Sequence, residues 1–148
     1  MKKFIILVCS FWVTAAAFPQ DPVHWTFSTM KNAEGRFEIR LAATVDRPWH
    51  TYSQGTPEGG PLPTKIVFSK NPLITLEGKT IEVGELRTTH DETFGVDVKF
   101  FTGNVEFVQV MKLKGKAKTK VTGTVEFMAC NDRQCLPPKT IPFTIQIP

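Results

Sequence analysis

The chain has 148 residues, of which 41% are hydrophobic and 22% charged, with 18 basic and 14 acidic side chains. This length is typical of one domain that buries a core without needing several disulfides. If a signal peptide removes Lys2 and Lys3, 16 basic residues remain against 14 acidic ones. That excess is too small to indicate binding to nucleic acid or to an anionic membrane.

The N-terminal segment has the features of a signal peptide, which we place at residues 1–17. Lys2 and Lys3 precede an apolar run from Phe4 to Val13, and Ala15–Ala17 supply the small residues that a signal peptidase requires. A membrane-spanning helix needs roughly 20 apolar residues, so this run is too short to span. We therefore expect residues 18–148 to form one domain without a membrane span, exported to the periplasm or another extracytoplasmic compartment.

Export decides how the cysteines are interpreted. Cys9 lies inside the apolar run, and Val8 before it is bulkier than the residue that a lipoprotein cleavage site needs. If Cys9 leaves with the signal peptide, Cys130 and Cys135 remain as an even pair in an oxidising compartment, where disulfides persist.

Hydrophobic and polar residues alternate along most of the remaining chain, which is typical of half-buried strands. No segment carries a helical stripe over three turns. Further strand candidates lie at residues 64–69, 80–87, 105–113 and 121–129, separated by turns rich in Gly, Pro, Asn and Lys. The clearest alternating sets are Val23, Trp25 and Phe27; Phe37, Ile39, Leu41, Ala43 and Val45; and Ile141, Phe143, Ile145 and Ile147.

Strands of this length and spacing predict an all-β fold. About seven to nine short strands in one domain indicate an antiparallel β-sandwich of immunoglobulin-like type, with a small closed barrel as the alternative. The stretch from Pro57 to Pro63 contains Gly59 and Gly60 and is expected to be a long loop.

The two remaining cysteines lie between two strand candidates. Val125, Phe127 and Ala129 share the apolar face of the first strand, so Cys130 is expected on the opposite face, outside the core. Cys135 begins the return, which the following prolines keep extended. The pair is therefore expected across the neck of a hairpin near the end of the sandwich.

A disulfide in this place has a structural and a redox interpretation. Cysteine pairs in exported domains are more often structural. Closing so short a loop, however, stabilises the fold by only about 2 kcal/mol in the chain-entropy model, against roughly 4 to 5 kcal/mol for a loop near 100 residues. Another protein can also reach a hairpin neck. The residues alone leave both open: a thiol–disulfide exchange site, and a secreted β-sandwich binding module with a purely structural disulfide.

Three segments, in the same order, resemble motifs of the N-terminal domain of the thiol:disulfide interchange protein DsbD. Cys130 to Cys135, followed by Leu136-Pro137-Pro138, resembles its active-site hairpin. Pro48-Trp49-His50-Thr51-Tyr52 resembles its aromatic motif, and Asp91-Glu92-Thr93-Phe94-Gly95 resembles the cap loop that shields the cysteines. The resemblance spans essentially the whole chain after the signal peptide and implies an immunoglobulin-like domain.

The resemblance also implies a function. Cys130 and Cys135 would cycle between dithiol and disulfide through mixed disulfides with partner proteins. The domain would accept electrons from a thioredoxin-like donor and pass them to oxidised periplasmic thioredoxin-fold partners, such as disulfide isomerases and cytochrome c maturation proteins. Because such contacts are transient, we expect a monomer.

The resemblance further implies that residues 91–95 shield the pair and that Trp49, His50 and Tyr52 are its neighbours. Negative charge near a thiol disfavours the thiolate, and an aromatic lid excludes water and small disulfides, so such a loop protects a reduced pair. Asp91 and Glu92 supply the charge.

The chain departs from the family pattern at several points. Thr93 precedes a single Phe94, whereas the family has adjacent aromatics in the cap. His50 stands where a tyrosine is usual, and it either packs, bonds to a neighbour or helps to move a proton. The spacing within the cysteine pair is shorter than in well-known members. The family's full protein continues into a membrane-embedded and a thioredoxin-like domain, so we expect this chain to act as a stand-alone domain that receives electrons from a separate polypeptide.

Other chemistries leave little trace in the sequence. Cysteine and methionine ligands would suit Cu(I), which leaves copper handling as a third hypothesis. The possible ligands are Cys130, Cys135, His24, His50, His90, Met111 and Met128. No Cys-x-x-Cys or His-x-x-x-His spacing indicates zinc, and no Cys-x-x-Cys-His indicates haem attachment. We therefore expect neither a metal nor a cofactor.

Overall fold

The structure is a computed structural model, and it describes residues 21–148. The predicted signal peptide at residues 1–17, with Cys9, lies outside the described residues and stays a prediction.

The described residues form nine strands and no helix, so this part of the chain has no helix able to cross a membrane. The strands are β1 (Val23–Lys31), β2 (Phe37–Val45), β3 (His50–Tyr52), β4 (Lys65–Phe68), β5 (Ile74–Asp91), β6 (Val96–Leu113), β7 (Thr119–Phe127), β8 (Ala129–Cys130) and β9 (Lys139–Ile147).

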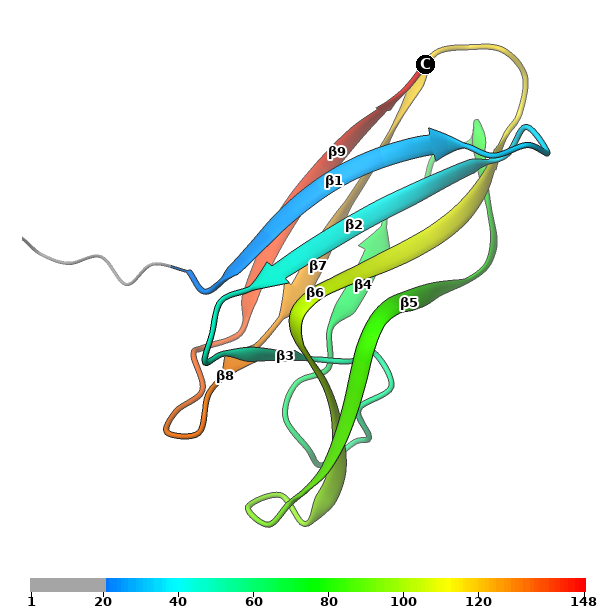
Figure 1. Ribbon diagram of the computed structural model, residues 1–148. Coiled ribbons are helices and arrows are strands. Elements are labelled where there is room, and N and C mark those ends of the chain that lie inside the picture. The colour runs from blue at the N-terminus through cyan, green and yellow to red at the C-terminus, as the bar shows by residue number, and fades with distance from the viewer. Residues whose placement is uncertain (1–20) are drawn as a thin grey trace, which may run out of the picture.

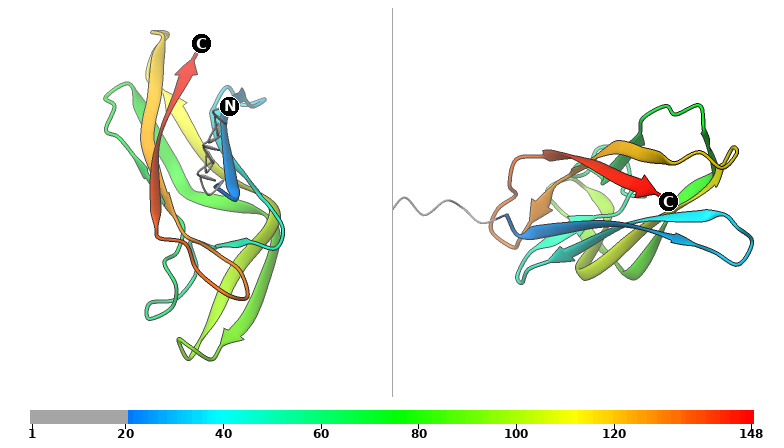
Figure 2. Two further views of the ribbon diagram at one scale, coloured as in Figure 1. Left: turned by 90° about the vertical axis from the view of Figure 1, so that its left-hand side faces the viewer. Right: turned by 90° about the horizontal axis from the view of Figure 1, so that it is seen from above.

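The strands make two antiparallel sheets (Figure 1). The larger sheet has six strands in the order β1-β2-β6-β3-β8, with β5 also paired to β6, and the smaller sheet has the order β4-β7-β9. The view from above in Figure 2 shows the two layers facing each other. The predicted all-β sandwich is therefore confirmed, and the sheets do not join into the closed barrel that was the alternative.

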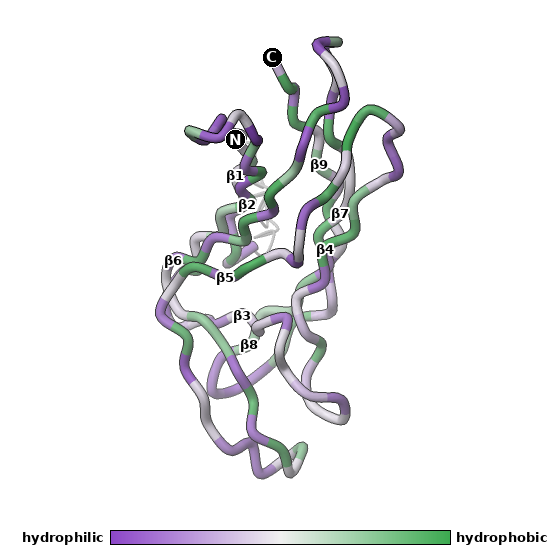
Figure 3. The backbone as a smooth tube through the Cα atoms, turned by 90° about the vertical axis from the view of Figure 1, so that its right-hand side faces the viewer, coloured by the Kyte–Doolittle hydropathy of each residue, from purple (hydrophilic) through white to green (hydrophobic). Residues whose placement is uncertain are grey.

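The alternating residues meet between the sheets as the main core. Ile39 and Leu41 of β2 and Val125 of β7 are completely buried. Trp25 of β1 packs between Phe107 and Phe127, with ring centroids 5.7 and 5.4 Å away. Hydrophobic and hydrophilic positions alternate along these strands in Figure 3, as expected for sheets with one buried face.

The predicted strands at 80–87 and 105–113 proved too short. β5 and β6 pair from Ile74 opposite Leu113 to Asp91 opposite Val96, and the far part of this hairpin, residues 86–101, extends beyond the sandwich (Figure 1). We call residues 86–101 the arm. A register shift between Gly84 and Leu86 marks where the arm begins. Residues 88–90, which follow the predicted strand, are all exposed, so they lack the alternation that would have extended the prediction.

The predicted strand at 121–129 is broken at Met128. β7 ends at Phe127 in the smaller sheet, and the chain then crosses to the larger sheet, where β8 pairs with β3. β3 in turn pairs with β6 through Thr51 opposite Phe101, at the junction with the arm. These two short strands cross the end of the sandwich (Figure 1) and place the cysteines there.

Candidate functional site

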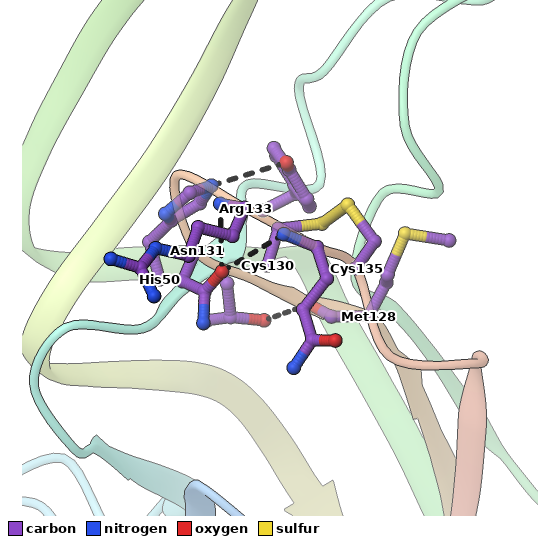
Figure 4. Close-up of a disulfide and its surroundings, with 9 residues drawn as sticks. His50, Met128, Cys130, Asn131, Arg133 and Cys135 are labelled. Carbon is purple, nitrogen blue, oxygen red and sulfur yellow. Dashed lines mark hydrogen bonds between the residues drawn. A yellow bond between two sulfur atoms is a disulfide. The ribbon is translucent and has the colours of Figure 1, made fainter.

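A short hairpin joins β8 to the return toward β9 and holds both cysteines. The amide of Asn131 donates to the carbonyl of Gln134 at 2.9 Å, and the amide of Leu136 donates to the carbonyl of Ala129 at 2.8 Å. The Asn131 side-chain Oδ1 also accepts from the amides of Arg133 and Gln134, each at 2.9 Å. This Asx-type turn brings Cys130 opposite Cys135, and the two form a disulfide (Figure 4).

The two sulfur-bearing residues differ in exposure. Cys135 is exposed, whereas Cys130 is only 2% exposed. Cys130 lies outside the main core, as the strand pattern predicts, but it is buried in a second, smaller cluster with Tyr52 and Val98. The alternation rule could not show this, because the strand breaks at Met128 and Cys130 then packs beneath the arm instead of facing solvent.

A groove of about 680 Å³, lined by both polar and apolar side chains, runs along the hairpin, and we call it the cysteine groove. The cysteine hairpin forms one side with residues 130–135, and the arm forms the other. Its remaining lining residues are Pro48, His50 and Tyr52 near β3, Arg87, Thr89, Asp91, Thr93 and Phe94 on β5 and the turn, and Val98, Phe100 and Thr102 on β6.

The aromatic motif is divided between the groove and the main core. His50 and Tyr52 line the groove, whereas Trp49 packs against the main core. Thr51 is completely buried, and its hydroxyl donates to the carbonyl of Met128 at 3.0 Å, at the point where the chain changes sheets. In register, His50 lies opposite Cys130. The period of two thus aims two of the expected site neighbours at the disulfide and leaves Trp49 in a packing role.

The expected cap loop forms the tip of the arm. The Asp91 carboxylate accepts from the amides of Thr93 at 2.9 Å and Phe94 at 3.3 Å, and Gly95 closes the turn with a φ of 68°. Asp91, Thr93 and Phe94 line the cysteine groove, while Glu92 is not among its lining residues. The side chain of Phe94 is 43% exposed. The single aromatic of the cap therefore lines the groove without being buried in it.

Two ionisable side chains at the groove have shifted pKa values. Burial lowers the pKa of His50 below its usual 6.5, and the negative charges of Asp132 and Asp91 oppose this in part. Burial, with a contribution from Asp91, raises the pKa of Tyr52 to about 12. The His50 Nε2 lies 3.2 Å from the Tyr52 hydroxyl. At neutral pH the imidazole is therefore uncharged, and the phenol keeps its proton.

Several groove residues were not predicted from the sequence. Arg87 and Thr89 precede Asp91 at a spacing of two, and this spacing is the one local signal that they share its face of β5. Val98 and Phe100 alternate in the same way on β6. Asp132 lies between the cysteines, where the motif itself could have drawn attention to its charge.

The described residues hold no evident metal centre. Across residues 21–148, no group of three or more His, Cys, Asp or Glu side chains converges in a way that would hold a metal ion.

Comparison with known proteins places the chain in a family. Residues 15–146 match the family described as thiol:disulfide interchange protein DsbD, N-terminal. A search among curated proteins gave no match.

Three solved structures share the fold. The reduced N-terminal domain of DsbD from Neisseria meningitidis has a TM-score of 0.61 at 13% identity, covering 88% of this chain and 90% of that one. The N-terminal periplasmic domain of ScsB from Proteus mirabilis has a TM-score of 0.58 at 14% identity, covering 88% and 48%. The complex between the DsbD and PilB N-terminal domains of Neisseria meningitidis has a TM-score of 0.55 at 11% identity, covering 87% and 86%. Since the family match extends over residues 15–146, nearly the whole chain, this protein belongs to the family of DsbD N-terminal domains.

Proposed function

We propose that this domain carries electrons in the periplasm by thiol–disulfide exchange at Cys130 and Cys135. It accepts them from a thioredoxin-like donor and passes them to oxidised partner proteins. The observation that carries the proposal is the position of the disulfide, which lies outside the main core and lines an open groove at the end of the sandwich. A partner sulfur can approach there without disturbing the core.

The unequal exposure of the cysteines supports different roles for the two sulfur atoms. Exchange requires a thiolate to reach one sulfur, and Cys135 is the exposed member of the pair. A donor thiolate attacks the Cys135 sulfur, and Cys130 leaves with the electron pair of the broken disulfide. The second donor thiol then displaces Cys135, so that the donor departs oxidised and the domain carries two thiols.

The cap loop protects the reduced pair in this proposal. Asp91 lines the groove and places negative charge near the thiols, which disfavours the reactive thiolate. Phe94 lies on the same wall and hinders the approach of small disulfides. A partner protein displaces the tip of the arm and gains access. Glu92 and Gly95 contribute through the charge and shape of the turn, and His50 and Tyr52 as groove neighbours.

The partners proposed are thioredoxin-fold proteins that bind transiently, including disulfide isomerases and components of cytochrome c maturation. A solved complex joins a DsbD N-terminal domain to the N-terminal domain of PilB, which supports recognition of a protein partner by this fold. The domain acts as a monomer, reaches the periplasm through a signal peptide at residues 1–17, and requires no metal or cofactor.

The reduction potential of the Cys130–Cys135 pair tests the proposal. The purified domain is equilibrated in glutathione or dithiothreitol buffers, and its free thiols are trapped and counted. A value between about −200 and −270 mV lets thioredoxin-like proteins turn the pair over and supports the carrier. A value well below about −300 mV identifies a structural bond in a binding module. Cys130→Ser and Cys135→Ser serve as controls, and each abolishes electron transfer while the sandwich stays folded.

A further inference from the structure

His50 is the immediate neighbour of Cys130 across two strands. The two residues are directly opposite in the antiparallel pair of β3 and β8. Opposite side chains in such a pair project to the same face, with Cβ atoms about 4.5 to 5.5 Å apart. Both residues line the cysteine groove, and Figure 4 shows His50 beside the hairpin that carries the disulfide. In the reduced protein the imidazole is therefore next to the Cys130 thiol.

Cys130 needs a local proton acceptor because it is buried. To form the disulfide it must react as a thiolate, yet it is 2% exposed and packs against Tyr52 and Val98. A charge in such surroundings is poorly solvated and costly. Cys135 is exposed and can exchange its proton with water, so the two cysteines differ in this requirement.

The imidazole is held in place for such a transfer. Its Nε2 lies 3.2 Å from the Tyr52 hydroxyl, and its ring packs edge-on against Tyr52 and tilted against Phe100, with centroids 5.3 and 4.9 Å away. When the Nε2 hydrogen is donated to the Tyr52 oxygen, the lone pair of Nδ1 is left free to accept a proton.

Two negative charges near His50 stabilise the imidazolium that forms when the ring takes up a proton. Asp132 of the cysteine hairpin and Asp91 at the end of β5 both act on the imidazole with negative charge. Arg87 and Arg133 line the same groove and are the positive groups present. The uncharged resting ring, which burial maintains at neutral pH, can thus take up a proton beside two carboxylates.

The other described histidines lack this environment. His24 pairs with Asp46 at 2.9 Å and His90 pairs with Asp97 at 2.8 Å, and both are exposed. Within residues 21–148, His50 is the histidine that lines the cysteine groove.

We propose that His50 accepts and returns the proton of Cys130 during thiol–disulfide exchange, a role that rests on the proposed function. Consider the reduced domain passing its electrons to an oxidised partner. The Cys135 thiolate has already attacked the partner disulfide, and the released partner sulfur has taken a proton from water. The Cys130 thiol then gives its proton to His50 as its sulfur attacks Cys135. The Cys130–Cys135 bond forms and the bond from Cys135 to the partner breaks. The departing partner thiolate then takes the proton from the His50 imidazolium. The partner gains two electrons and two protons.

The lifetime of the mixed disulfide tests this step. The reduced domain is mixed with oxidised protein disulfide isomerase, quenched with acid, and separated on a non-reducing gel at intervals between about pH 5.5 and 9.5. His50→Phe keeps an aromatic ring, and His50→Gln keeps a hydrogen-bonding group near Tyr52, but neither accepts a proton in this pH range. We expect both variants to prolong the mixed disulfide at pH 7 by about tenfold or more.

The pH profile separates a proton relay from a packing effect. In both variants the rate of resolution should rise about tenfold per pH unit below the pKa of the thiol, because only preformed thiolate reacts. In the wild type the rate of resolution should level off once His50 is deprotonated. His24→Phe is the matched control and should behave like the wild type.

Each other outcome overturns the proposal in a recognisable way. If the wild type resolves the mixed disulfide and the His50 variants match it at every pH, the relay is wrong and the proposed function stands. A slowing by the same factor at all pH values shows a positioning role only. If the wild type transfers no electrons to the isomerase, the proposed function fails and the relay with it.

An NMR titration gives a second test that does not depend on folding of the His50 variants. In Cys135→Ser, the His50 ring signals should show a second inflection as the Cys130 thiol ionises. Ring signals that show no second inflection at the ionisation of the Cys130 thiol would overturn the proposal.

Discussion

Tyr52 is the only tyrosine of the chain, and its side chain provides a direct probe of the second cluster. It is 3% exposed, and burial together with Asp91 raises its pKa to about 12. We predict that the tyrosinate absorbance of the folded protein stays small up to pH 11 and reaches half of its full value near pH 12. In the unfolded chain it should appear at the usual value of 10.0.

The raised pKa of Tyr52 makes the free energy of unfolding fall at high pH. Because the folded-state pKa is above the unfolded one, the contribution is fully present below pH 10 and is lost as the pH rises through about 12. The difference of about two pKa units corresponds to at most about 2.7 kcal/mol of unfolding free energy. Tyr52→Phe cannot ionise and should lack this part of the alkaline destabilisation.

Urea denaturation at about pH 9 and about pH 11.5, followed by tryptophan fluorescence, measures the difference for both proteins. The reasoning is refuted if the folded protein shows tyrosinate absorbance near pH 10, since the hydroxyl would then be solvated. It is also refuted if Tyr52→Phe loses as much stability between the two pH values as the wild type.

Three further predictions concern packing and access. Gly123→Ala should lower the unfolding free energy by about 1 to 3 kcal/mol in urea denaturation, because the added Cβ would clash with the Val67 carbonyl and with the Phe143 ring; an unchanged midpoint would contradict this. Phe94→Ala should leave stability within about 0.5 kcal/mol but let hydroxyethyl disulfide oxidise the reduced protein several times faster, and an equal rate would show that the cap does not shield. Cys135→Ser should lower the unfolding free energy by no more than about 2 kcal/mol and form no covalent complex with a partner on non-reducing gels. A complex that persists would show that Cys130, and not Cys135, bonds to the partner.

The sandwich itself could be predicted because its strands have one buried face. The sets in β1, β2 and β9 alternate in sequence and are buried in the main core or packed against it, so the predicted fold and the predicted family are both confirmed. The arm could not be predicted in this way. Residues 85–90 have no buried face, and their strand is held by pairing with β6, a contact that local periodicity does not encode.

Local sequence patterns predicted only part of the candidate site. The hairpin neck at Cys130 and Cys135 followed from the residues around it, and the structure places both cysteines there. The burial of Cys130 depends on the chain changing sheets at Met128 and on the arm lying over it, both of which are long-range features. The pairing of His50 with Cys130 joins residues 80 positions apart, so no spacing rule could indicate it. The signal peptide stays a prediction.

β6 belongs both to the sandwich and to the arm, so the arm is a continuation of a core strand. β2 pairs with β6 from Gly103 to Met111, and β3 pairs with it at Phe100 and Phe101, whereas residues 96–99 of β6 pair with β5 within the arm. The register shift at Gly84 and the positive φ of Gly103, 76°, coincide at the point where the two strands bend away from the sandwich (Figure 1). The arm is thus held at its base by β2 and β3, and its tip extends beyond these pairings. We predict that a displacement of the tip of the arm disturbs the second cluster of Tyr52, Val98 and Cys130 and leaves the main core packed.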